Sequence, residues 1–284
     1  MHEELTLALG DERTLHVRRM GAGPDLVLLH GALTTGHDWR TAPIEPLVSD
    51  YRVTVPDRPG HGGSRRPRLA GTPRDQARQL LDGLERLGVE RPLVVGHSFG
   101  GLVALAMAEA AQERLAGLVL AAPIAFPEAR LLEHSVLAPR SVPVLGPLLS
   151  RLGEASRFDR ALLEIVQREM FAPAAIPRRW KESFPYAAVL DAEGLVFEGE
   201  DAAAILPMSP AGTIDLTRIR IPVTVVTGTA DRVVEDERQG KALARLLPRA
   251  RLIEIEGAGH MLHHTHSAAL LDAIRDMAAA PAAA

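Results

Sequence analysis

Short apolar runs alternate with longer amphipathic stretches along the first 121 residues of the chain. Apolar runs beside glycine or proline are typical of buried strands. Apolar residues three or four positions apart are typical of helices, as in the stretch that Thr72 can cap and that carries Leu80, Leu81, Leu84 and Leu87. The pattern therefore predicts strands at 5–9, 14–18, 25–30, 51–55, 93–95 and 115–121, and helices at 39–48, 72–87 and 100–113.

The alternation stops in the middle of the chain and then resumes. Residues 123–215 are rich in alanine, proline, arginine and leucine and show no period of two, so they predict short helices separated by prolines. The clearest of these helices are expected at 160–170 and 180–191. Beyond them the pattern predicts strands at 221–227 and 251–255 and helices at 236–247 and 267–277.

Strands that alternate with helices of this length predict an α/β fold with a mostly parallel, doubly wound sheet of eight strands. The first two strands flank Gly10-Asp11 and are expected to form an antiparallel hairpin. The helical block interrupts this pattern before the last two strands. We therefore expect a core formed by 1–123 and 216–284, with a helical cap, or lid, formed by 124–215.

Composition removes several classes of function. The net charge of -4 gives no support for nucleic-acid binding, and the absence of cysteine excludes disulfides and thiolate nucleophiles. No apolar run reaches the roughly 18 residues that a membrane span needs, and the first residues lack the apolar stretch of a secretory signal. We expect a cytoplasmic, globular bacterial protein that acts on a small molecule, and the sequence is compatible with a homo-oligomer.

The sequence GHSFG, residues 96–100, lies where a predicted strand must become a predicted helix. A serine in such a tight turn takes a strained backbone conformation, and the flanking glycines allow close packing. Its hydroxyl is then exposed at the carboxyl edge of the sheet, beside the Phe99 amide at a helix N-terminus. This arrangement suits a nucleophile whose transition state carries an oxyanion, which makes Ser98 the candidate nucleophile.

A serine nucleophile needs a base, and the base needs an acid that orients it. His260 follows the last predicted strand and Asp231 follows the preceding one, so both are expected at the same sheet edge as Ser98. The chain order Ser98, Asp231, His260 is the order expected for a triad on an α/β-hydrolase sheet.

Other histidines near His260 leave alternatives open. His263, His264 or His266 could be the base instead, although their expected role is that of exposed or partly packed residues at the start of the final helix. A metal site formed by these residues together with His260 is a minor alternative, because carboxylates around them are sparse.

The second oxyanion donor is expected in the loop after the 25–30 strand, with the Ala32 amide as the first candidate and the Leu33 amide as the next. His30 is expected to brace that loop. The acid and base of the segment 56–64, Asp57 and His61, are expected to hold their own loop together.

Taken together, the segments LLHGALTTGHDW, VTVPDRPGHGGS, LVVGHSFGG, VVTGTADRVV and IEGAGHMLHH make the sequence resemble the α/β-hydrolase fold superfamily. The resemblance is to its lidded branch of esterases, perhydrolases, enol-lactonases and carbon–carbon bond hydrolases. It implies Ser98 as nucleophile, His260 as base, Asp231 as acid, the Ala32 and Phe99 amides as oxyanion hole, and no cofactor or metal. Epoxide hydrolases and haloalkane dehalogenases carry aspartate in place of Ser98, which disfavours those activities.

The sequence analysis thus predicts a serine hydrolase that cleaves a carboxylic ester with an apolar acyl part. Lactone hydrolysis, carbon–carbon bond hydrolysis and perhydrolysis use the same triad, and a small-molecule receptor on this fold is the alternative from another class. We expect Leu33, Trp180 and Phe184 to bind substrate. Further apolar cap residues considered for the pocket are Phe171, Tyr186, Leu190, Phe197 and Met208.

Overall fold

The strands form one eight-stranded sheet in the order β1-β2-β4-β3-β5-β6-β7-β8. The computed structural model describes residues 2–129, 131–207 and 209–279. The first two strands pair antiparallel, β2 also pairs antiparallel with β4, and all other neighbours are parallel. The strands are β1 (His2–Gly10), β2 (Arg13–Met20), β3 (Asp25–Leu29), β4 (Arg52–Pro56), β5 (Leu93–His97), β6 (Gly117–Ala121), β7 (Val223–Gly228) and β8 (Ala250–Ile255). The predicted fold class is confirmed.

Alternate residues of the central strands face opposite sides of the sheet. In β3, Val27 and Leu29 pack into one hydrophobic cluster, whereas Leu26 and Leu28 pack into the other. Every residue of β3, β5, β6 and β7 is buried, because helices cover both faces. The helices of the sheet region are α1 (His37–Thr41), α2 (Glu45–Asp50), α3 (Pro73–Arg86), α4 (Phe99–Ala111), α11 (Gly240–Leu246), α12 (Leu262–Thr265) and α13 (Ser267–Ala279), with 3₁₀ turns η1 (Gln112–Arg114) and η4 (Leu216–Arg218).

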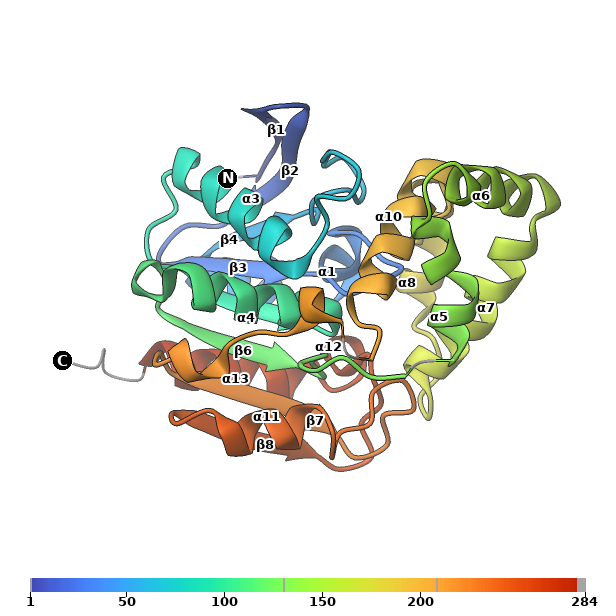
Figure 1. Cartoon of the computed structure of the whole chain (residues 1–284). Coiled ribbons are helices and arrows are strands. Elements are labelled where there is room, and N and C mark those ends of the chain that lie inside the picture. Colours follow the sequence, from blue (N-terminus) through green and yellow to red (C-terminus); the bar gives the residue numbers. More distant parts are fainter. Residues whose placement is uncertain (1, 130, 208, 280–284) are drawn as a thin grey trace.

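Between β6 and β7 the described residues form helices, as the sequence predicted. Figure 1 shows this helical segment beside the carboxyl end of β6, on one side of the molecule. Its elements are α5 (Leu131–Val136), η2 (Ala138–Ser141), α6 (Leu145–Ser156), α7 (Phe158–Phe171), α8 (Arg178–Ser183), α9 (Tyr186–Val189), α10 (Ala192–Ala204) and η3 (Pro210–Gly212). None of the helices in the described part of the chain has the length and apolar character needed to span a membrane.

Two predicted helices are each divided in the structure. The helix expected at 180–191 ends as α8 at Ser183 and resumes as α9 after Pro185, and the one expected at 39–48 is divided around Pro43. Proline has no backbone N–H to donate and its ring clashes with the preceding turn, so both boundaries follow from the sequence. The helix expected from residue 236 begins at Gly240, because residues 236–239 form turns.

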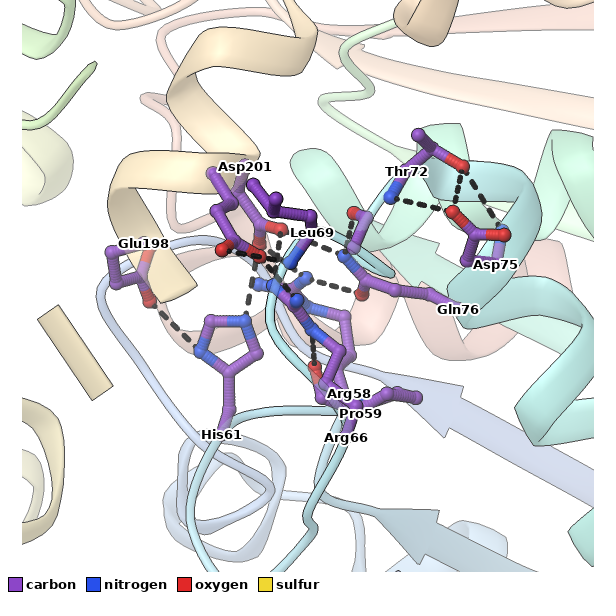
Figure 2. Close-up of polar contacts among 12 residues, drawn as sticks. Arg58, Pro59, His61, Arg66, Leu69, Thr72, Asp75, Gln76, Glu198 and Asp201 are labelled. Atoms are coloured by element: carbon purple, nitrogen blue, oxygen red, sulfur yellow. Dashed lines mark hydrogen bonds and ion pairs between the residues drawn. The ribbon is translucent and has the colours of Figure 1, made fainter. Parts of the chain in front are cut away.

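The helix α10 docks on the sheet region through buried ion pairs (Figure 2). Its Asp201 accepts from Arg58 at 2.7 Å, and its Glu200 pairs with Arg66. The side chains of both arginines are fully buried. Removing one partner of such a pair leaves an uncompensated buried charge, so these contacts fix where α10 lies relative to the sheet.

The helix α4 approaches β3 so closely that it requires glycine at one point. A Cβ atom on Gly100 would lie 2.5 Å from the carbonyl oxygen of His30 and 2.7 Å from that of Leu29. Both are backbone atoms of the buried strand and the residue after it, and neither can move without disturbing the sheet.

We therefore expect Gly100→Ala to lower the melting temperature by several degrees or to prevent folding, because overpacking a core costs about 1–3 kcal/mol. Gly194→Ala is the matched control. Gly194 also lies in a helix, but a Cβ there has no neighbour closer than 3.6 Å, so its melting temperature should stay the same or rise slightly. Thermal unfolding of the three proteins tests this, and equal melting temperatures would contradict the packing argument.

Candidate active site

Ser98 occupies the junction between β5 and α4 in a strained conformation. Its φ of 53° and ψ of -121° are unusual for a residue with a side chain, and such strain costs of order 1–3 kcal/mol. The backbone is held there by three hydrogen bonds: Ser98 N–H donates to Ala121 O, and Ser98 O accepts from the N–H groups of Gly101 and Ile124. Strong local restraint at one serine is typical of a residue placed for chemistry.

Ser98 and His260 line the same cavity, which has a volume of about 40 Å³. Ala32 and Phe99 line it as well, so the residues expected at the nucleophile, base and oxyanion positions come together. A neighbouring cavity of about 60 Å³ is lined almost entirely by apolar side chains. The two cavities share Leu33, Leu137 and Val166 as walls.

Asp231 stands behind His260 and fixes its orientation. Its Oδ2 accepts a 2.8 Å hydrogen bond from His260 Nδ1, while Oδ1 accepts from the amides of Val233 and Val234 at 2.7 and 3.0 Å. Burial acts to raise the pKa of Asp231, but the charge and hydrogen bond of His260 and the two amide bonds together lower the pKa below its usual value. Asp231 is therefore ionised, and the Nδ1–H tautomer leaves Nε2 of His260 able to accept a proton.

The loop after β3 distinguishes the two candidate oxyanion amides. Leu33 has a φ of 55°, and its N–H donates to Glu198 Oε1 at 2.8 Å, so this amide already has a partner. Ala32 remains the candidate of the two. His30 braces the loop as predicted, because its Nε2 accepts from Arg58 N–H while its Nδ1 donates to Gly31 O.

Asp57 and His61 serve as contacts between segments. Asp57 accepts from the amides of Gly36 and Gly63 at 2.7 and 2.8 Å and so ties two loops together. His61 instead contacts α10, with Nδ1 3.2 Å from Glu198 and Nε2 3.1 Å from Asp201. The prediction that this acid and base hold their loop in place is met by Asp57, while His61 links the loop to the helical segment.

Of the histidines after His260, His263 is fully buried, which was not expected, whereas His264 and His266 as whole residues are partly packed, as predicted. The side chains of His263 and His264 are both buried, and both donate to Asp38, at 3.0 and 2.7 Å. The indole N–H of Trp180 donates to the same carboxylate at 3.1 Å. Burial of Asp38 opposes ionisation, but His263 and His264 outweigh it and hold the pKa of Asp38 well below its usual range. No local pattern predicts this contact, because Asp38 lies 225 residues from His263 in the sequence.

Of the residues expected to bind substrate, only Leu33 lines the cavities. Trp180 and Phe184 are 1% and 8% exposed and pack on each other with ring centroids 4.6 Å apart, in a cluster that includes Phe171. This cluster joins the helical segment to the sheet region. Its Leu163 and Met170 reach the cavity walls, but Phe171, Trp180 and Phe184 line neither cavity. Trp180 and Phe184 are therefore corrected from pocket residues to packing residues.

Of the remaining apolar residues considered for the pocket, one lines a cavity and others make contacts elsewhere. Leu190 lines the second cavity, whereas Phe197 packs under the guanidinium of Arg66 at 4.3 Å and the hydroxyl of Tyr186 donates to Gln167. Met208 lies outside the described residues.

Residues missed by the sequence reasoning form much of the cavity walls. They are Leu137, Val166, Met170, Ile205 and Glu198. Val166 and Met170 are spaced four residues apart on α7, which marks one face of that helix. Glu198 is one of three buried acidic residues, with Glu200 and Asp201, that follow the apolar residues 195–197 of α10, a signal that the sequence did carry.

Two groups of side chains have the donor types that a metal ion uses. The first is Asp38, His97 and His263, and the second is His61, Glu198 and Asp201. In the first group the rings of His97 and His263 have centroids 4.3 Å apart, and His263 Nε2 already donates to Asp38. In the second group both nitrogens of His61 already face carboxylates. In each group at least one histidine nitrogen is therefore already engaged by a carboxylate of the same group.

Comparison with known proteins identifies the family. A family model described as the alpha/beta hydrolase fold matches residues 24–267. The chain belongs to this family. It is 32% identical over 265 residues to the magnesium-chelatase 30 kDa subunit of Rhodobacter capsulatus, covering 89% of this chain and 86% of that protein. It is 31% identical over 291 residues to the 2-hydroxymuconate semialdehyde hydrolase of Pseudomonas sp. strain CF600, covering 98% and 94%. A solved structure of a hydrolase from Pseudomonas aeruginosa PA01 matches with a TM-score of 0.75 and 26% identity, covering 98% and 99%.

The buried histidines of this α/β hydrolase make its stability depend on pH. Burial, with the nearby His264 and His260, outweighs Asp38 and lowers the pKa of His263 to about 4. Because this value lies below that of the unfolded chain, about 6.5, the unfolded state gains the proton first as the pH falls. The contribution of His263 to the free energy of unfolding is therefore constant above about pH 6.5 and becomes less favourable as the pH falls from there to about pH 4.

His263→Gln keeps a donor for Asp38 but cannot take up a proton. Between pH 7 and pH 5, its free energy of unfolding should therefore fall by about 2 kcal/mol less than that of the wild type. Urea unfolding at both pH values measures this difference. His266→Gln changes a neighbouring, partly exposed histidine and should keep the wild-type pH dependence. An unchanged pH dependence in His263→Gln would contradict the assignment of a buried neutral His263.

Proposed function

We propose that this α/β hydrolase is a cofactor-independent serine hydrolase that cleaves carboxylic esters through an acyl-enzyme. The observation that carries the proposal is the shared cavity of Ser98 and His260, with His260 held through Nδ1 by the ionised Asp231. A strained serine at a strand–helix turn, a histidine and a buried aspartate in this chain order form the arrangement that activates a hydroxyl nucleophile.

In the proposed reaction, His260 Nε2 takes the proton from Ser98 Oγ as that oxygen attacks the ester carbonyl. Asp231 keeps its hydrogen bond to Nδ1–H and stabilises the imidazolium without itself taking a proton. The amides of Ala32 and Phe99 donate to the oxyanion, with Phe99 at the positive end of α4. The alcohol leaves with the proton from His260. Water then attacks the acyl-enzyme with the same base, and the carboxylic acid is released.

We further propose that the helical segment 124–215 acts as a cap that determines the acyl part of the substrate. The walls that it contributes to the cavities are mostly apolar and include Leu137, Val166 and Met170. Such walls favour an apolar acyl chain through the area that the chain removes from water. A closed cap also limits the access of bulk water to the reacting groups, which strengthens the electrostatic interactions among them.

Two other functions are favoured by particular relatives. The similarity to a 2-hydroxymuconate semialdehyde hydrolase supports a hydrolysis of that type on the same three residues. The similarity to a protein named as a chelatase subunit supports a non-catalytic role as a binding partner. A fluorophosphonate probe followed by a panel of esters, lactones and β-diketones separates the three, because a binding partner should not turn over any of them.

Ser98→Ala should abolish labelling by a fluorophosphonate probe and lower turnover of p-nitrophenyl esters by at least about a thousand-fold, because the nucleophile is lost. The fold should persist, since the side chain is small and sits at the turn. Ser183→Ala changes a serine on α8 outside both cavities and should react like the wild type. Undiminished turnover by a clean Ser98→Ala preparation would overturn the proposed function.

The cap proposal predicts which residue sets acyl chain length. Val166→Phe adds volume at the junction of the two cavities, so kcat/KM should fall for longer p-nitrophenyl esters and change little for the acetate. Ile165→Phe is the matched control, since Ile165 is the adjacent residue of α7 and is 54% exposed. If both variants gave the wild-type chain-length profile, these cavities would not hold the acyl chain.

A further inference from the structure

One charged side chain reaches the cavity of Ser98 without a complete set of partners. Glu198 lies on α10, is 3% exposed, and lines this cavity together with Ser98 and His260. Apart from Asp201, the remaining walls are mostly apolar. A carboxylate buried in such surroundings is costly unless its oxygens accept hydrogen bonds.

The two acidic residues of the cavity differ in how their oxygens are used. Asp201 Oδ1 accepts from Gln76 at 2.7 Å, and its Oδ2 accepts from Arg58 at 2.7 Å and His61 at 3.1 Å. Glu198 Oε1 accepts from the Leu33 amide and faces His61. Among the described residues, Glu198 Oε2 has no hydrogen-bond partner. Asp201 is therefore fully engaged in packing α10, whereas Glu198 has one oxygen left for a ligand.

The charge of Glu198 is already compensated. Figure 2 shows His61 between Glu198 and Asp201, with one ring nitrogen toward each. Burial and Arg58 act to lower the pKa of His61, but the two carboxylates outweigh them and raise it above its usual value. Because each ring nitrogen of His61 faces a carboxylate oxygen, the doubly protonated ring is the form that donates to both, and its positive charge offsets negative charge at this site. A cationic ligand would add an unpaired buried charge here, whereas a neutral hydroxyl or amide N–H would not.

We propose that Glu198 Oε2 accepts a hydrogen bond from a neutral hydroxyl or amide N–H group of the substrate, close to the ester that Ser98 attacks. The inference rests on the proposed function, and it narrows the substrate class to esters that combine an apolar chain with such a donor. Hydrogen bonds to charged groups are among the stronger ones in proteins, so a substrate with the donor should be preferred by about tenfold or more.

The test compares matched esters in the wild type and in Glu198→Gln. The pairs are p-nitrophenyl 2-hydroxyhexanoate and 3-hydroxyhexanoate against the hexanoate, and 2-hydroxyethyl hexanoate against ethyl hexanoate. Each kcat/KM is divided by the rate of hydroxide hydrolysis, which removes intrinsic reactivity. In the wild type at least one hydroxylated ester should exceed its parent by about tenfold.

Glu198→Gln replaces the acceptor at Oε2 with an NH₂ group, which is a donor. The glutamine oxygen can still accept from the Leu33 amide and His61, so its NH₂ group is turned toward the cavity. The preference for the hydroxylated ester should fall about tenfold, while p-nitrophenyl 3-oxohexanoate, which can only accept at that position, should gain relative to the hexanoate. A gain for one substrate is not produced by a damaged fold.

Glu193→Gln is the matched control, because Glu193 is a carboxylate of the same helix that pairs with Arg65 at the surface, outside the cavity. It should keep the wild-type preferences. A wild type that hydrolyses the hexanoate through Ser98 but shows no preference for any hydroxylated ester would overturn this inference and leave the proposed function intact. A preference that persists in Glu198→Gln would also overturn it. Absence of turnover of every ester would overturn both.

Discussion

The position of Ser98 depends on how closely α4 can pack against the parallel strands. The chain leaves β5, turns at one residue with positive φ, and enters α4 directly. That conformation persists because the Ser98 backbone bonds to Ala121 and Ile124 on the neighbouring segment, and because Gly100 lets the helix approach the end of β3. The strain at Ser98 is thus balanced by hydrogen bonds and packing of the whole central sheet. A change in any of these strands would alter the direction in which the hydroxyl points.

Buried carboxylates hold the loops around this turn in place. Asp231 receives donors from His260 and its own turn, Asp57 ties two loops through backbone amides, and Asp38 collects His263, His264 and Trp180. Each carboxylate joins segments far apart in the chain, so each fixes a relation that local backbone preference would not. Because an ionised buried group is costly when it loses a donor, these contacts restrict the loops to one arrangement. The precision of the site therefore comes from polar contacts, while the stability of the sheet comes from apolar burial.

Patterns of short range made the sheet predictable from the sequence, while contacts of long range did not. The signal for the buried strands around Val27 and Val94 lies within a few residues, and so does the signal for the turn at Ser98. These strands and the strand–helix turn were therefore correctly predicted. Trp180 and Phe184 are apolar residues in the helical segment, and nothing local separates a pocket wall from a packing contact. Trp180 is held by Asp38, 142 residues away in the sequence, and Phe184 packs on Trp180. The same applies to Glu198, whose partners Leu33 and His61 lie in other loops.

Polar contacts fasten the helical segment to the sheet region at two places. Trp180 of α8 is bonded to Asp38, and α10 is held by Arg58 and Arg66 through Asp201 and Glu200. Moving either helix away would expose or unpair buried charges, which costs several kcal/mol per group. The walls contributed by Leu137 and Val166 carry no such charge and can change shape at the smaller cost of apolar repacking. Recognition of a polar group by Glu198 is thus built on a fixed helix, while the fit to an apolar chain is left to walls that can adapt.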